Sequence, residues 1–328
     1  MNKGNFVYYY VFIYTGVVME ISQDVKDGIN CGIGATSGFA VYKYAPRYIL
    51  RPYGKYVLSD IKKITKEEND IFWSSANKAY ENSKLAEEVP KVLGPKIPTN
   101  KRTLILHIDS SNKKNIYKEI LQRAQKFKQP LIMKTWLWKI IFGDSVKKFN
   151  RSVIAAAYGT NAFCIPRLTD RSSLVVVNKD KMAYSAFHEL GHAINAHSSG
   201  VKNFLSKTRG LFALGVPITL LIGLLSNKQK EANQKSVTND KKKTNFIKDN
   251  CGLISTLLLL PMVIEEGLAS INGAKLAKNV LDKNMYKKLN KLNTKAWLSY
   301  LLATFITGLT VHSAVKIKDK IVDYKPIK

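Results

Sequence analysis

Three apolar runs in the C-terminal half of the chain constrain what it can fold into. They cover residues 210–226, 250–264 and 296–315. A helix needs about 20 apolar residues to cross a bilayer, so the third run is a full span and the first two are close to the minimum. Trp297 and Tyr300 stand near one end of the third run, where aromatic side chains anchor a helix at the membrane interface. The runs predict an integral, multi-pass membrane protein, and the alternative is a set of buried core helices.

The N-terminal part is also apolar in places. Residues 6–18 are too few to span a bilayer. Lys3 is the only basic residue before them and no small-residue cleavage site follows, so the pattern of a signal peptide is incomplete. Met19 is an alternative start of the chain. Residues 29–42 are small and apolar, and they predict either a weak membrane segment or a buried glycine-rich hairpin.

Residues 43–129 have the charged, helix-forming composition of a soluble domain. Within them, "TLILHI" at 103–108 predicts a strand. We expect His107 in this strand to be structural, because a lone histidine in a strand is more often a packed residue than a metal ligand.

The composition narrows the partners. The formal net charge of +28 would suit nucleic acid or an anionic membrane surface. The basic residues, however, are lysines spread among asparagines, with no aromatic-basic RNA-binding motif and no zinc-finger spacing, so nucleic acid is not expected as a partner. The lysine-rich stretch 227–249 predicts a flexible loop outside the membrane.

The cysteines exclude two kinds of site. Cys31, Cys164 and Cys251 are odd in number, far apart and not in any C-x-x-C pair. This argues against a disulfide framework and against a structural zinc knuckle. Any metal site in this chain must therefore use histidine and carboxylate ligands.

One motif carries chemistry. "AFHELGHAINAH" at 186–197 places His188, Glu189 and His192 in the order H-E-x-x-H. On a helix, histidines four residues apart share a face and can offer two imidazole nitrogens to one ion, while the glutamate is turned away from the ion but toward a water beside it. The alternative is a pair of core histidines without a metal.

The motif helix is expected to be buried. We predict that Asp180 caps a helix that begins at Lys181, and apolar residues cover most of its circumference. His197 lies nine residues after His188, on the opposite side of the helix, and the metzincin positions for glycine and histidine hold Asn195 and Ser198. We therefore expect His197 to cap the helix or to support a ligand, rather than to bind metal itself.

The third ligand should be a carboxylate from a later helix. Glu265 and Glu266 directly follow the second apolar run, where paired acids are unusual without a partner. Neighbouring residues on a helix point about 100° apart, so only one of the two can face the histidines. Which one does so is open at this point.

"HELGHAINAH" resembles the active-site helix of membrane-embedded zinc metallopeptidases of the HtpX and CAAX prenyl protease type. That family carries a ligand glutamate in an E-x-x-A-D pattern, and Glu266 to Ala269 match its first four positions, with Ser270 in place of the aspartate. "TNAFCIP" at 160–166 and "LVVVN" at 174–178 are similar to the family's N-A-F segment and to the strand before the active-site helix. In the family that strand lies beside bound substrate.

The resemblance implies a mainly α fold with a small β-sheet, in which transmembrane helices are inserted between the H-E-x-x-H helix and the third-ligand helix of a zincin-like metallopeptidase core. It implies Zn²⁺ held by His188, His192 and Glu266, with Glu189 as the general base of a metalloendopeptidase. Ser270, Glu265 and His197 would support the ligands. His312 and Tyr300 are candidates for stabilising the oxyanion, and neither is assigned.

On this basis we expect a protein or peptide substrate at the membrane surface. The lysines of the loop would place the site outside the cell and the resemblance implies a cytosolic site, so the side of the membrane stays open. Two alternatives also stay open: a catalytically inactive zinc-binding adaptor, suggested by Ser270, and a basic membrane-attached binding protein with a fortuitous motif. The expected segments are an apolar, membrane-associated part (1–50), a soluble zincin-like domain (51–209), a transmembrane hairpin (210–264), a third-ligand helix region (265–295), a transmembrane helix (296–316) and a basic tail (317–328).

Overall fold

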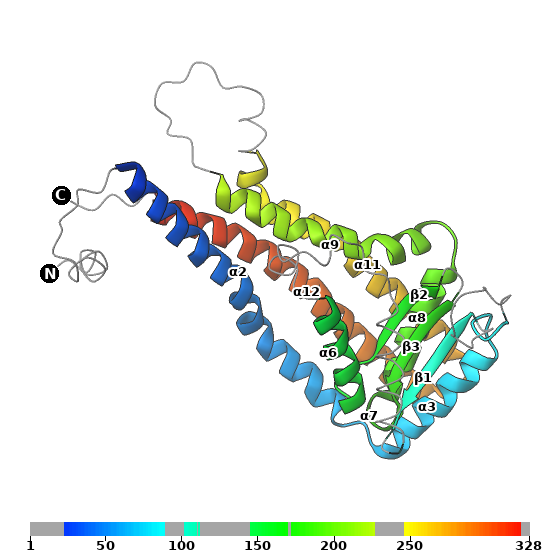
Figure 1. Ribbon diagram of the computed structural model, residues 1–328. Coiled ribbons are helices and arrows are strands. Elements are labelled where there is room, and N and C mark those ends of the chain that lie inside the picture. The colour runs from blue at the N-terminus through cyan, green and yellow to red at the C-terminus, as the bar shows by residue number, and fades with distance from the viewer. Residues whose placement is uncertain are drawn as a thin grey trace. The chain divides into compact units, whose positions relative to one another are not determined.

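The computed structural model describes residues 23–88, 102–109, 111, 145–169, 172–226 and 246–322 (Figure 1). These residues are mostly helical and include a small sheet, as expected, and the sheet is mixed and has three strands. The chain divides into two compact units, the first made of residues 1–49, 218–255 and 306–328 and the second of residues 50–217 and 256–305. The predictions for residues 6–18, for the loop up to residue 245 and for the end of the tail from residue 323 lie outside the described residues.

The sheet belongs to the second unit. Its order is β1 (Thr103–Ile108), β3 (Ser172–Asn178), β2 (Phe163–Thr169), with β1 parallel and β2 antiparallel to β3. The predicted strands at 103–108 and 174–178 are confirmed. The latter is the central strand, so among the described residues β1 and β2 are both outer strands, each with one edge that has no neighbouring strand.

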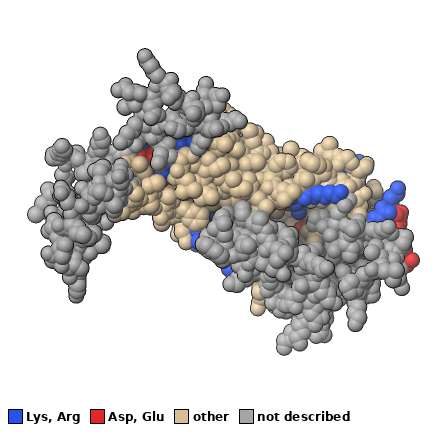
Figure 2. Space-filling model, turned by 45° about the horizontal axis from the view of Figure 1, so that its top comes forward, with Lys and Arg blue, Asp and Glu red and all other residues tan. Residues whose placement is uncertain are grey.

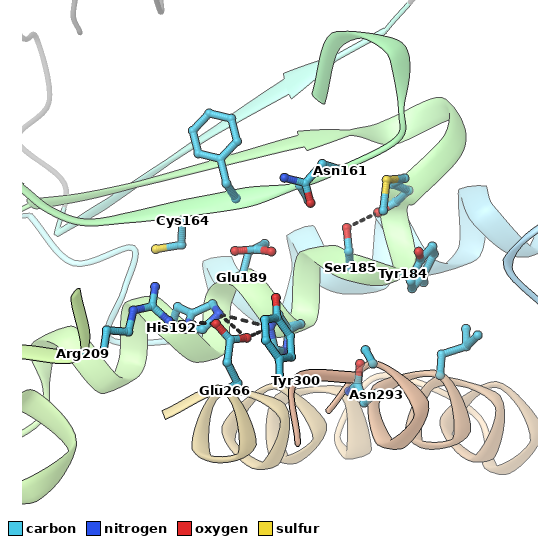
Figure 3. A pocket seen from close by; sticks show the side chains of 16 residues that line it. Asn161, Cys164, Tyr184, Ser185, Glu189, His192, Arg209, Glu266, Asn293 and Tyr300 are labelled. Atoms are coloured by element: carbon cyan, nitrogen blue, oxygen red, sulfur yellow. Dashed lines mark hydrogen bonds and ion pairs between the residues drawn. The ribbon is translucent and has the colours of Figure 1, made fainter. Parts of the chain in front are cut away.

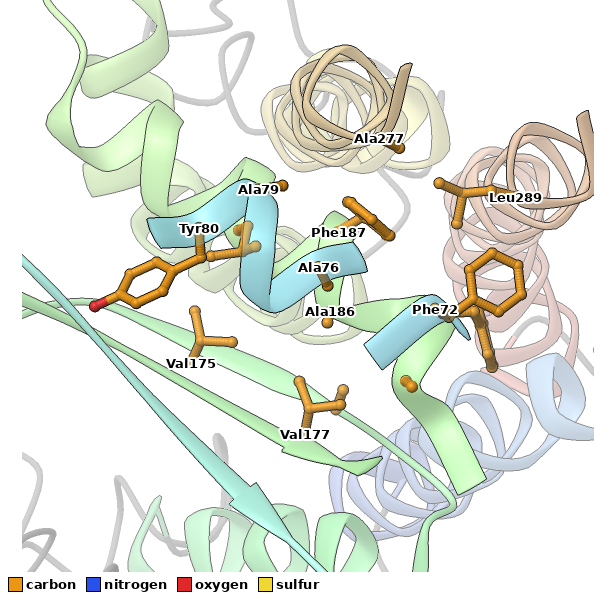
Figure 4. Packing of buried hydrophobic residues seen from close by; sticks show 14 of the residues in the cluster. Phe72, Ala76, Ala79, Tyr80, Val175, Val177, Ala186, Phe187, Ala277 and Leu289 are labelled. Carbon is orange, nitrogen blue, oxygen red and sulfur yellow. The ribbon is translucent and has the colours of Figure 1, made fainter. Parts of the chain in front are cut away.

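Both faces of β3 are covered because alternate residues of a strand point to opposite sides. Val175 and Val177 pack in one core cluster with α3 (Lys66–Glu81) and α8 (Ala186–His197), whereas Leu174 and Val176 pack in another with α6 (Ser145–Tyr158). The first cluster also takes in Phe72, Phe187 and Leu289 (Figure 4). The motif helix α8 is therefore buried, as expected.

The start of the motif helix differs from the prediction. Asn178, not Asp180, is the cap: its side chain accepts the backbone N–H of Asp180 and of Lys181, each at 3.1 Å, and begins the short helix α7 (Lys179–Met182). A 3₁₀ turn, η2 (Ala183–Ser185), separates α7 from α8. The interruption has a tertiary cause, because Asn69 of α3 accepts the Ala183 N–H at 3.0 Å.

The first 50 residues also differ from one of the two expectations. Residues 29–42 lie within α2 (Gln23–Ile61), a single helix, so the hairpin is wrong. Gly34 and Gly38 serve helix packing instead of a turn: a Cβ at Gly38 would lie 2.6 Å from the Ala314 carbonyl oxygen of α12 (Lys283–Val322), and one at Gly34 would lie 3.0 Å from the Lys318 carbonyl oxygen. Small residues allow helices to approach this closely.

Three described helices are long and apolar enough to cross a membrane: α9 (Val201–Leu225), α11 (Cys251–Lys278) and α12. On the face shown in Figure 2, a broad area is tan, which means that its residues are neither Lys, Arg, Asp nor Glu. α11 continues without a break past residue 264, so the third-ligand region is not a separate helix. Apolar side chains exposed on these helices include Leu211, Leu221, Leu225, Leu253, Leu257, Ile264, Leu302, Phe305 and Leu309.

Candidate metal centre

Two glycines bring the motif helix and α11 into backbone contact. A Cβ at Gly191, inside the H-E-x-x-H motif, would collide with the carbonyl oxygen of Ala269 on α11. A Cβ at Gly273 would collide with the carbonyl oxygen of Phe187 on α8. The close approach places the middle of α11 directly beside the two motif histidines.

Three ligand atoms converge at this contact. His188 Nε2 and His192 Nε2 lie 3.1 Å apart, and Glu266 Oε2 lies 3.1 Å from the first and 3.4 Å from the second. Four atoms about 2.1 Å from a zinc ion at tetrahedral angles lie roughly 3.4 Å from one another, so the spacing fits one shared ion. Among the described residues, these three make up the group of His, Cys, Asp and Glu side chains that could hold a metal.

The outward nitrogens of both histidines are held as well. His188 Nδ1 is 3.1 Å from Ser270 Oγ, and His192 Nδ1 is 2.9 Å from Glu265 Oε1. Such partners fix the tautomer and orientation of a metal-binding imidazole, because an Nδ1–H that donates outward leaves Nε2 free for the ion. Ser270 therefore supports His188 from behind, and Glu265 orients His192 in the same way.

Glu265 and Glu266 thus have different surroundings, which the sequence left open. Glu266 faces the histidines, whereas Glu265 lies behind His192, is 0% exposed and accepts a hydrogen bond at 3.1 Å from Asn195 Nδ2. Arg209 of α9 joins them: its Nη1 donates to Glu265 Oε2 and, at 2.9 Å, to Glu266 Oε1.

Arg209 was missed in the sequence analysis. It is the last arginine of the chain and stands immediately before the first apolar run. A cation directly beside the apolar run of one helix and a pair of acids in another helix are a signal for an ion pair between the helices, since ionisable groups in such helices need partners.

The charges also fit a divalent cation. The carboxylates of Glu189, Glu265 and Glu266 are buried, and the Arg209 guanidinium balances one of them. With neutral histidines, two negative charges remain in a region that excludes water, where unpaired charges are costly. A zinc ion would offset both.

The centre opens into a cavity of about 280 Å³ (Figure 3). Glu189 and Tyr300 line it beside the three candidate metal ligands. The cavity lies within the second unit, and its lining residues are Asn161, Ala162, Phe163, Cys164, Met182, Tyr184, Ser185, His188, Glu189, His192, Arg209, Glu266, Leu292, Asn293, Ala296 and Tyr300.

Burial shapes the acid–base properties of the cavity wall. It raises the pKa of Glu189 above the ordinary value, although the neighbouring histidines oppose the shift. It also raises the pKa of the Cys164 thiol well above its usual range, and the charge of Glu189 adds to the effect. Burial works against a charged His192, but hydrogen bonds to Glu265 and Glu266 outweigh it and raise the pKa of His192 to about 10. A metal at His192 would replace that proton.

The remaining histidines lie elsewhere. His197 is the last residue of α8, and its Nε2 is 3.0 Å from Ser173 Oγ on β3. His107 of β1 lies beside Trp73, with ring centroids 5.4 Å apart. Of the two candidates for oxyanion stabilisation, Tyr300 is among the residues that line the cavity and His312 is not.

Comparison with known proteins gives no relative for this chain. No protein-family model matches it, and neither a curated protein nor a solved structure does. The resemblance to membrane zinc metallopeptidases therefore rests on the short motifs around His188, Glu266 and the preceding strands.

Proposed function

We propose that the protein is a membrane-embedded zinc-dependent endopeptidase with a zincin-like core. His188, His192 and Glu266 would hold the ion, and Glu189 would be the general base. The observation that carries the proposal is the convergence of three ligand atoms at 3.1–3.4 Å on one wall of a cavity that Glu189 also lines. Two histidines and a glutamate form a ligand set of catalytic zinc sites, which keep one position open.

A zinc ion bound here would supply Lewis acidity toward a carbonyl oxygen and would make water more acidic. Glu189 takes a proton from a water molecule as that water attacks the carbonyl carbon of a peptide bond. Its raised pKa favours this uptake. Glu189 then passes the proton to the departing amine as the C–N bond breaks, and the products are a carboxylate and an amine.

Tyr300 is the donor that we assign to the developing oxyanion. It lines the same cavity as Glu189 and Glu266, from the facing helix α12. A preorganised hydroxyl that donates to the oxygen as negative charge develops lowers the barrier of acyl transfer.

The expected substrates are membrane-associated proteins or peptides. Arg209, Glu265 and Glu266 lie within helices apolar enough to cross a membrane. Ionisable residues in such helices are costly and mark functional sites. A site built from these residues would receive chains that lie at or in the bilayer.

The first experiment is the zinc content of detergent-purified protein, compared with that of Glu265→Gln, Glu266→Gln and Glu189→Gln. We expect about one zinc per chain, lost mainly in Glu266→Gln and retained in Glu189→Gln, which should no longer cleave a fluorogenic peptide library. Zinc without turnover in the unsubstituted protein would favour the inactive adaptor. No zinc after reconstitution under reducing conditions would favour the basic binding protein.

A further inference from the structure

The cavity holds a buried polar group that the metal centre does not use. Asn293 of α12 is 7% exposed and lines the cavity. Its Nδ2 has no hydrogen-bond partner among the described residues. The same helix lines the cavity with Leu292 and Ala296, so this carboxamide lies on an otherwise apolar stretch of wall.

The other buried asparagines behave differently. Nearly all buried polar groups in proteins are paired, because an unpaired donor removed from water is unfavourable. The four other asparagines that are buried in the described part of the chain follow this rule, each with a side-chain hydrogen bond: Asn69, Asn178, Asn195 and Asn272. A leucine at position 293 would fill a similar volume without an unpaired donor, so stability alone does not account for this asparagine.

The surroundings of Asn293 define what could bind it. Figure 3 shows Asn293, Tyr184 and Ser185 on the side of the cavity away from Arg209. Ser185 Oγ already donates to the Met182 carbonyl at 2.6 Å. Burial raises the pKa of Tyr184, so its hydroxyl stays protonated and can donate.

This side of the cavity therefore offers neutral donors. The only lysine or arginine among the lining residues, Arg209, is bound to Glu265 and Glu266. A carboxylate placed here would be buried without a counter-charge and near Glu189. An uncharged acceptor between apolar walls meets neither penalty, and such walls with a few placed donors are typical of binding pockets.

We propose that Asn293 is a specificity determinant. It forms a subsite for an uncharged substrate side chain whose hydroxyl or carboxamide group accepts a hydrogen bond from the Asn293 Nδ2. The inference rests on the proposed function, since it takes the ligand to be a peptide. It adds the chemical class of one substrate residue, Ser, Thr, Asn or Gln.

The first test asks whether Asn293 is unpaired in the free protein. Asn293→Leu should leave the melting temperature unchanged or raise it. Asn272→Leu is the matched control, because Asn272 is equally buried but donates to Asn195 Oδ1 at 2.6 Å, and it should lower the melting temperature. An equal loss of stability in both variants would mean that Asn293 is structural and would overturn the inference.

The second test measures which peptide side chains the protein prefers to bind, in a variant that is not expected to cleave them. Zinc-loaded Glu189→Gln protein is bound to an arrayed peptide library, alone and combined with Asn293→Leu or Asn293→Asp. We expect a preference for Ser, Thr, Asn or Gln at one peptide position, reduced about tenfold or more by Asn293→Leu in favour of Leu and Met. Asn293→Asp should shift the same position toward Lys.

The outcomes separate the two proposals. One unchanged profile in all three proteins overturns the Asn293 subsite and leaves the peptidase proposal intact. An Asn293-dependent profile, with no hydrolysis by the unsubstituted protein, supports the subsite and contradicts the peptidase. Absence of any bound peptide overturns both.

Discussion

The Arg209 guanidinium donates to Glu266 Oε1 at 2.9 Å, which leaves Glu266 Oε2 as the oxygen that faces His188 and His192. The same nitrogen contacts Glu265, the residue behind His192. One cation from α9 thus links the carboxylate that would bind the metal to the carboxylate that orients a histidine. A change in the charge at Arg209 should therefore also change how Glu266 and His192 are oriented.

Arg209→Met should destabilise the metal-free protein by about 3–5 kcal/mol, since removing one partner leaves buried Glu265 and Glu266 without their counter-charge. Zinc should raise the melting temperature of this variant more than that of the unsubstituted protein, because the ion replaces the lost positive charge. Differential scanning fluorimetry with and without zinc measures both effects. Lys207→Met, an exposed change on the same helix, is the control. Equal zinc shifts in all three proteins would contradict the prediction.

Ser270 should determine how tightly zinc binds through His188. Ser270→Ala removes the partner of His188 Nδ1 and should weaken zinc binding about 10- to 100-fold. Ser270→Asp supplies a stronger acceptor and should tighten it. Competition with a chromophoric chelator gives the affinities. Ser299→Ala, which removes a hydroxyl that donates to the Ala296 carbonyl, should change nothing. Identical affinities for Ala, Ser and Asp at position 270 would show that this contact does not orient the ligand.

Gly191→Ala should separate the motif helix from α11. The added methyl group would collide with the Ala269 carbonyl, and overpacking of this kind costs about 1–3 kcal/mol. The melting temperature and the zinc content should therefore fall together. Gly210→Ala is the matched control, because nothing lies within 4 Å of its Cβ, and helix propensity predicts a neutral or stabilising effect. A Gly191→Ala protein with normal zinc content would argue against the glycine contact as the device that builds the site.

Cys164 should react slowly with thiol reagents at neutral pH. Burial raises the pKa of its thiol well above the usual range, and only the thiolate is nucleophilic. Below that pKa each unit of pH changes the thiolate fraction about tenfold, so alkylation should accelerate about tenfold per unit between pH 7 and 9 without a plateau. Mass spectrometry of iodoacetamide-treated protein gives the rates. Because Cys164 lines the cavity, its modification should block peptide cleavage, whereas Cys164→Ser should be insensitive. A rate that levels off near pH 7 would contradict the raised pKa.

The sequence alone determined which residues share a face and which segments are buried. Helical spacing predicted that His188 and His192 lie together, and the apolar residues around them predicted the buried helix that the structure contains. Apolar patterns predicted the strand at 103–108 and the long apolar helices, and the resemblance to the metallopeptidase motifs implied the strand at 174–178. These features depend on the repeat of side-chain directions along a helix or a strand, and a short stretch of sequence is enough to show this repeat.

Only the tertiary structure decided what meets the histidines. The roles of Glu265 and Glu266, the partners of Arg209 and Ser270, and the unpaired amide of Asn293 all depend on how far α8, α11 and α12 are rotated and how closely they approach. That approach is set by contacts such as Gly191 against Ala269, between residues far apart in the chain. The same reason explains two wrong expectations: Asn69, distant in sequence, interrupts the predicted helix before α8, and Gly34 and Gly38 serve helix packing rather than a hairpin. Local patterns carry no information on such long-range contacts, whose energies arise only once the helices have packed.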